Sequence, residues 1–336
     1  MQTTADNAES AEISQKLTNI GTCISLGAII CVMVDSKTHK AGFRRSPGKP
    51  VEITARDLQV LYLLARYRFL DSDQIVALVR EGSAQHLKRR LQDLFHAGFV
   101  DRPRAQIRYF ATDGRKPFVY ALARLGAKAL MDYGKVDKIR LDWANKNKTV
   151  QEPAIKHTLS IADALIPFEM QKHEAFISEA ELLGVGTMRK PLRWKVQLAA
   201  AQGGQEIGVV PDSYFALRDR AGKSRYFFLE ADRGKMPIVR TGPRQTSLLE
   251  KVFAYTASYS KKLPQEQFGI HAFRVVLMVP SEERRQNFIN AVREALGDKA
   301  GWMFLVGTYD GLKAADPFDY EFLDARGATV KLGQEA

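Results

Sequence analysis

Apolar residues between positions 54 and 98 recur every three or four residues, in three short runs separated by polar breaks. Side chains three and four apart share one face of a helix, so this spacing predicts three short amphipathic helices. Residues suited to helix caps stand at the breaks. They are Thr54, Asp71 or Ser72, Ser83, and Gly98. The region therefore has to bury three helix faces against one another.

The next segment changes to a strand pattern. Phe99-Val100 begins it, an arginine-rich stretch runs to Lys116, and residues 118–122 form a second apolar run. A fourth amphipathic helix is expected from about 123 to 133. Three short helices, a β-hairpin with a basic tip and a closing helix predict a winged helix-turn-helix domain over 51–135.

Basic residues are concentrated in this part of the chain. The whole protein carries 50 Lys and Arg against 38 Asp and Glu, a net charge of +12. Residues 33–150 hold 24 basic and 12 acidic side chains, so this segment accounts for nearly all of the excess. A positive field confined to one domain is typical of a protein that binds a polyanion.

The third helix and the hairpin supply the expected DNA contacts. A recognition helix enters the major groove with its N-terminal residues on base edges, and basic loops follow the phosphates. Gln85, Lys88 and Arg89 are the expected base readers, and Arg90 is expected on a phosphate. The expected hairpin contacts are Arg102, Arg104, Arg108, Arg115 and Lys116, interleaved with Tyr109 and Phe110.

The first 50 residues are interpreted as a leader followed by a flexible basic arm. Residues 18–34 are uncharged and apolar but barely long enough to span a bilayer. A buried or disordered leader, a marginal membrane anchor and a non-native extension all fit, and we favour a non-essential leader. Cys23 and Cys31 are the only cysteines, so the body of the chain holds no disulfide framework. This favours a cytoplasmic protein, with no membrane expected.

A second domain is expected over 154–310, after a charged linker at 136–153, with 311–336 as a C-terminal tail. Its periodicity predicts an α/β domain with a mixed sheet. Helices are expected at 154–172, 245–262 and 282–296, and strands near 175–183, 206–218, 224–231, 273–279 and 302–306.

Three carboxylates mark this second domain. Asp212 follows an apolar strand and Pro211, and Glu230 and Asp232 lie at the end of another apolar run. Period two places Glu230 and Asp232 on one strand face. If the strands pair, Asp212 and Glu230 converge, and their hard oxygens suit Mg²⁺. Such an ion polarises a phosphodiester and helps deprotonate water.

At these residues the chain resembles the PD-(D/E)xK restriction-endonuclease-like fold, whose core order α-β-β-β-α-β matches 154–279. The whole arrangement is similar to the replication-relaxation family of plasmid and mobile-element proteins with an N-terminal winged helix. The resemblance covers roughly 50–310. It is carried by Asp57-Leu58, Arg68-Phe69-Leu70, Arg89-Arg90-Leu91, Pro211-Asp212, Glu230-Ala231-Asp232-Arg233-Gly234, Lys251 and Tyr255.

The nuclease pattern has lysine where this chain has Asp232. The resemblance therefore implies a catalytic set of Asp212, Glu230, Asp232 and a displaced Lys251, with Asp212 and Glu230 as metal ligands. In the alternative interpretation, Glu230, Asp232, Arg233 and Lys251 form structural ion pairs at a sheet edge.

Three functions remain open from the sequence. The first is a DNA-binding protein of plasmid or mobile-element replication whose second domain is catalytically silent. The second is a Mg²⁺-dependent DNA endonuclease, and the third is an adaptor that brings a protein partner to DNA. The expected partner is double-stranded DNA, with a second copy of the chain or a replication or transfer protein as further candidates.

Overall fold

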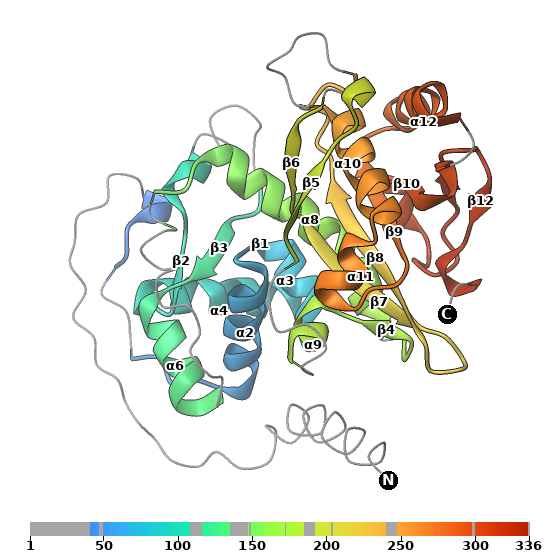
Figure 1. Ribbon diagram of the computed structural model, residues 1–336. Helices are drawn as coiled ribbons and strands as arrows, with labels where there is room; N and C mark the ends of the chain where they lie inside the picture. The colour runs from blue at the N-terminus through green and yellow to red at the C-terminus, as the bar shows by residue number, and fades with distance from the viewer. Residues whose placement is uncertain are drawn as a thin grey trace. The chain divides into compact units, whose positions relative to one another are not determined.

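The computed structural model (Figure 1) describes residues 41–46, 50–107, 116–134, 147, 149–171, 173–184, 192–202, 204–239, 247–297 and 300–334. The chain divides into two compact units, Met1–Leu159 and Ser160–Ala336, and the division falls inside helix α8 (Glu152–Gln171). Both units contain helices and strands, so the expectation of an α/β protein is confirmed.

The first unit contains the expected helices with the expected caps. They are α2 (Ala55–Tyr67), α3 (Ser72–Val79), α4 (Ala84–Ala97) and α6 (Arg124–Gly134). The side chains of Thr54, Asp71 and Ser83 accept backbone N–H groups at the starts of α2, α3 and α4. Gly98 ends α4 with φ at 85°, a conformation that costs glycine little.

A three-stranded antiparallel sheet completes this unit. Its order is β1-β3-β2, with β1 at Phe69–Asp71, β2 at Val100–Asp101 and β3 at Val119–Leu122. The pairing of β2 with β3 matches the expected hairpin, whereas β1 was not expected from the sequence. The short helix η3 (Arg104–Gln106) follows β2, and the tip residues Arg108, Tyr109, Phe110 and Arg115 lie outside the described residues.

The expectation of a flexible arm is wrong for residues 41–46, which include the short helix η2 (Ala41–Phe43). Phe43 is buried and packs edge-on against Phe118, with ring centroids 5.7 Å apart. The carbonyl of Gly42 accepts a hydrogen bond from Arg102, and Arg45 donates to the carbonyl of Val100. An aromatic anchor and two arginine hydrogen bonds therefore hold this segment to the first unit.

The second unit is built on a seven-stranded mixed sheet of order β12-β11-β10-β9-β8-β7-β4. Strands β8, β9 and β10 are parallel, and the other neighbours are antiparallel. The strands are β4 (Phe176–Ile177), β7 (Ser213–Arg218), β8 (Ser224–Ala231), β9 (Phe273–Val279), β10 (Phe304–Thr308), β11 (Phe322–Asp324) and β12 (Thr329–Val330).

Helices cover both faces of this sheet. The main core joins Phe228 of β8 to Val252 of α10 (Leu248–Ser260) and Phe288 of α12 (Glu282–Leu296). On the other face, Phe168 of α8 packs against Phe215 of β7, with ring centroids 5.3 Å apart. Shorter helices complete the unit: α9 (Glu179–Gly184), η4 (Ala200–Gln202), α11 (Leu263–Phe268), η6 (Gly301–Met303), α13 (Tyr309–Ala314) and η7 (Leu332–Gln334).

Several boundaries differ from the expected ones. The strand expected at 175–183 ends at Ile177, and α9 follows it, begun by Ser178, whose hydroxyl bonds Glu181. The strand expected at 206–218 is two strands. β6 (Glu206–Val209) pairs with the unexpected β5 (Trp194–Gln197) in a separate two-stranded sheet, and β7 joins the large sheet.

The segment 311–336 was expected to be a tail, and this expectation is wrong. It contributes β11 and β12 to the edge of the large sheet, where β11 pairs with β10. Phe322 and Asp324 of β11 are fully buried, because the segment closes the core beside β10. In the described part of the chain, no helix has the length and apolar character needed to cross a bilayer. Residues 18–34 lie outside that part.

Candidate functional site

Helix α4 buries one face and exposes the other. Leu87, Leu91 and Leu94 are almost fully buried in the first unit. Gln85, His86, Lys88 and Arg89 are exposed around the first two turns, and Gln92 and Asp93 continue that surface. The exposed polar face of α4 is therefore one continuous stretch that begins at the helix N-terminus.

The three consecutive basic residues of α4 have different surroundings. Lys88 pairs with Asp73 of α3 at 2.5 Å, with both side chains about half exposed. Arg90 donates from Nε and Nη2 to the two oxygens of Asp57, at 2.9 and 2.7 Å, and this hydrogen bonding raises the pKa of Arg90. Within the described residues, Arg89 forms no ion pair. Of the three basic residues, Arg89 is thus the one that is exposed to solvent and forms no ion pair with another described residue.

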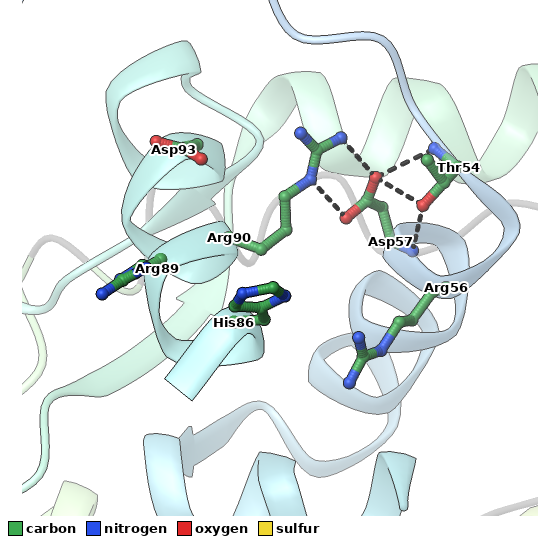
Figure 2. Close-up of a pocket in the computed structure, with 7 residues that line it drawn as sticks. All are labelled: Thr54, Arg56, Asp57, His86, Arg89, Arg90 and Asp93. Carbon is green, nitrogen blue, oxygen red and sulfur yellow. Dashed lines mark hydrogen bonds and ion pairs between the residues drawn. The ribbon is translucent and has the colours of Figure 1, made fainter. Parts of the chain in front are cut away.

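A hollow lies between the start of α2 and the exposed face of α4. Figure 2 shows α2 side chains on one side of it and α4 side chains on the other. Its lining residues are Thr54, Arg56, Asp57, His86, Arg89, Arg90 and Asp93. Arg56 does not stand out in the sequence, because nothing in the spacing shows that the first turn of α2 lies beside α4.

Arg102 was expected at a phosphate, and the structure corrects this. Arg102 is only 6% exposed. Its guanidinium carbon lies 4.4 Å from the ring centroid of Phe95 and 4.1 Å from that of Phe118, and Nη2 donates to the hydroxyl of Tyr120 at 2.9 Å. A guanidinium enclosed between aromatic rings is a packing element, so we leave Arg102 out of any DNA-binding surface.

The two other described residues of the hairpin that were expected to contact DNA, Arg104 and Lys116, are exposed. Arg104 begins η3, and Lys116 precedes β3. Gln106 fixes the fold between them, since its side chain donates to the carbonyl of Val119 and accepts from the N–H of Val119, both at 2.8 Å. Arg104 and Lys116 are therefore exposed side chains on backbone segments that the Gln106 hydrogen bonds hold in place.

The expected carboxylates of the second unit do lie together, where β8 ends. Ser213 of β7 is paired with Leu229 of β8, which places Asp212 beside Glu230. One Asp212 oxygen accepts a hydrogen bond from the N–H of Ala231 at 2.8 Å. The carboxyl ends of β8, β9 and β10 meet at this edge because the three strands are parallel. Open α/β sheets commonly bind ligands at such an edge.

Glu230 is buried and held by two side chains of α10. Lys251 Nζ lies 2.5 Å from Oε2, and the Tyr255 hydroxyl donates to Oε1 at 2.5 Å. Residues four apart share a helix face, so one turn of α10 supplies both partners. Burial raises the pKa of Glu230 to about 7, with Lys251 opposing and Asp212 adding to the effect. Burial lowers the pKa of Lys251, but the carboxylates of Glu230 and Asp212 outweigh it and raise this pKa.

Asp232 has a partner that the sequence did not suggest. It forms an ion pair with Arg284 of α12, which also donates to the carbonyl of Met236. The other Asp232 oxygen accepts from the N–H of Gly234 at 3.1 Å. Fifty-two residues separate Asp232 from Arg284, and no short-range pattern connects them. Tyr309, the first residue of α13, has a raised pKa through burial and the nearby Asp232 and Asp212.

A magnesium ion does not fit this cluster as it is arranged. Both oxygens of Glu230 are engaged by Lys251 and Tyr255, and Asp232 is taken by Arg284. Among the described residues, no group of three or more His, Cys, Asp or Glu side chains stands where it can hold a metal. Mg²⁺ demands near-octahedral oxygen coordination, and here Lys251 stands where a cation would bind Glu230. The Lys251–Glu230 pair is one that the structural ion-pair interpretation named, whereas Asp232 pairs with Arg284 and not with the expected Arg233.

The fold and these two clusters define a two-unit α/β protein with a basic helix face in one unit and buried ion pairs at a sheet edge in the other. The model of the replication-relaxation family matches residues 61–271, and the chain belongs to that family. The match includes α4, Asp212, Glu230 and Lys251. No curated protein and no solved structure matches the chain. Family membership supports a role related to replication.

Proposed function

We propose that this protein binds duplex DNA through its first unit and acts in the replication, or the control of replication, of a plasmid or mobile element. The arrangement of α3, the turn at 80–83, α4 and the β2–β3 pair supports a winged helix-turn-helix. In such domains the helix in the position of α4 enters the major groove. Membership of the replication-relaxation family supplies the link to replication.

One observation carries the proposal: the first turns of α4 are exposed and polar, and ion pairs join the helix to α2 and α3. Gln85 and Arg89 project to solvent, while Lys88 and Arg90 tie the same helix to α3 and α2. Arginine forks onto guanine and glutamine pairs with adenine in the major groove. Because the flanking basic residues hold the helix, Arg89 is presented without the freedom of a loop side chain.

The direct test measures binding of a fluorescent duplex by anisotropy at several salt concentrations. We expect Arg89→Ala to lose about 1–3 kcal/mol of binding free energy on a specific site and to relax sequence preference. Arg220→Ala, at an exposed turn between β7 and β8, removes an equal charge from the second unit and serves as the control. A wild-type protein that ignores duplex DNA at low ionic strength would end this proposal.

Metal-dependent cleavage is the second candidate. The order α8, β4, β7, β8, α10, β9 favours a restriction-endonuclease-like core, and Asp212 lies beside Glu230 at its edge. We rank cleavage below binding because Lys251 and Tyr255 already engage Glu230. Incubation of supercoiled plasmid with the protein and Mg²⁺ or Mn²⁺ distinguishes cleavage from binding alone. Cleavage lost in both Asp212→Ala and Glu230→Ala would establish a nuclease, and intact plasmid under both metals would leave the binding protein.

A further inference from the structure

The hollow between α2 and α4 is lined mainly by donors. Asp57 is the one buried acid among the lining residues, and it already forms an ion pair with Arg90. The Asp57 carboxylate also accepts from the N–H and the hydroxyl of Thr54, at 2.9 and 2.8 Å. Asp57 therefore has little capacity left for a further cation. Arg56, His86 and Arg89 remain as the outward-facing donors, against the exposed Asp93.

Arg56 is held at the rim of the hollow. Its guanidinium donates to the carbonyl of Glu81 and lies beside Gly82, so it bridges the start of α2 and the turn before α4. Its Nε is buried and has no hydrogen-bond partner among the described residues. Because this atom has no exposed surface, it faces the protein and not the hollow, so a ligand in the hollow would meet the terminal N–H groups of the guanidinium.

The start of α4 adds to the positive character of the hollow. No acidic residue stands in the first turn of this 14-residue helix, so no carboxylate of that turn opposes the helix dipole. His86 lies on that turn and is exposed. Figure 2 shows His86 between Arg89 and Arg56, which brings donors of two helices to one hollow.

We propose that this hollow binds a single phosphate of the DNA backbone, held by Arg56 with His86, while Arg89 beside them remains available to a base edge. The proposal rests on the proposed function, because it names the contact that sets the position of α4 on the duplex. A tetrahedral phosphate accepts from several donors at once, and arginine binds it through two parallel N–H groups. Such contacts position a protein on DNA and carry no sequence information.

The test compares Arg56→Gln, Arg56→Lys and Arg220→Gln in the full chain, with matching thermal melts to confirm folding. We expect Arg56→Gln to weaken binding to specific and unrelated duplexes alike, by about three- to tenfold, and to reduce the salt slope of log K by about one. Arg56→Lys retains the charge, so it keeps most of the slope. Arg220→Gln leaves both quantities unchanged.

Two results would overturn the phosphate site. One is a folded Arg56→Gln protein whose salt slope and affinity equal those of the wild type, which would leave DNA binding itself intact. The other is an Arg56-dependent shift of the His86 ring resonances on adding inorganic phosphate, without any Arg56 effect on DNA binding. That outcome would assign the hollow to a free phosphate. A wild-type protein that binds no duplex fails earlier, at the proposed function.

Discussion

Arg90 in α4 and Asp57 in α2 form a two-point ion pair across 33 residues of sequence, with N–O distances of 2.9 and 2.7 Å. Asp57 also caps its own helix through Thr54. One carboxylate therefore fixes both the start of α2 and the position of α4. Asp57 and Arg90 are among the residues that carry the resemblance described from the sequence, and in the structure they contact each other.

Asp57→Asn is expected to lower the free energy of unfolding by about 1–3 kcal/mol. The change removes a charged partner from Arg90 and weakens the capping box of α2. Urea unfolding followed by circular dichroism measures it. Asp93→Asn is the matched control, because Asp93 borders the same hollow but is exposed. Equal losses of unfolding free energy in the two variants would show that the Asp57–Arg90 pair stabilises the protein no more than an exposed acid does.

Arg102 and Arg104 should separate packing from DNA contact. Arg102→Met leaves the Tyr120 hydroxyl and the Gly42 carbonyl without their donor, so we expect a loss of about 2–4 kcal/mol in unfolding free energy. Arg104→Met changes an exposed residue and should cost under about 0.5 kcal/mol. In DNA titrations we expect the opposite ranking: Arg104→Met should reduce the salt dependence of binding, and Arg102→Met should leave it unchanged. A stable Arg102→Met protein with a reduced slope would restore Arg102 to the DNA surface.

The stability of the protein should depend on pH through Glu230. Its pKa is about 7 in the folded chain, against an ordinary 4.5, and burial is the main cause. Between these values the folded chain binds more protons than the unfolded chain, so unfolding free energy falls as pH rises through this window. The Glu230→Gln variant should lose this fall, which amounts to at most about 3 kcal/mol. If the unfolding free energies of the wild type and the Glu230→Gln variant changed equally with pH from about 4.5 to 8 in urea unfolding, Glu230 would not be the source of the pH dependence.

The Lys251–Glu230 pair should show energetic coupling. Lys251→Met leaves Glu230 without its cation, and because 40% of the Lys251 side chain is exposed we expect a cost of only about 1–3 kcal/mol at pH 8. Combining it with Glu230→Gln should recover part of the loss, with a coupling energy of about 1–2 kcal/mol. Thermal melts of the four proteins of this double-mutant cycle measure it. Additive losses would mean that the two residues do not act as a pair.

Much of the candidate DNA surface followed from local pattern. Helix α4 was placed by its apolar spacing, by Ser83 and by Gly98, because caps and periodicity are short-range properties. The exposure of Gln85 and Arg89 follows from the same periodicity. The burial of Arg102 did not, since an arginine in a basic stretch looks the same whether it meets solvent or the rings of Phe95 and Phe118.

The sequence by itself determined the main helices of both units, the caps of the first three helices, and the approach of Asp212 to Glu230 on paired strands. Only the tertiary structure decided which charges are neutralised. Arg284 reaches Asp232, Lys251 reaches Glu230, and Arg90 reaches Asp57 across loops and helices of 52, 21 and 33 residues. Side chains so far apart in the chain meet only because helices pack on a sheet or on one another, and short-range spacing does not encode that packing.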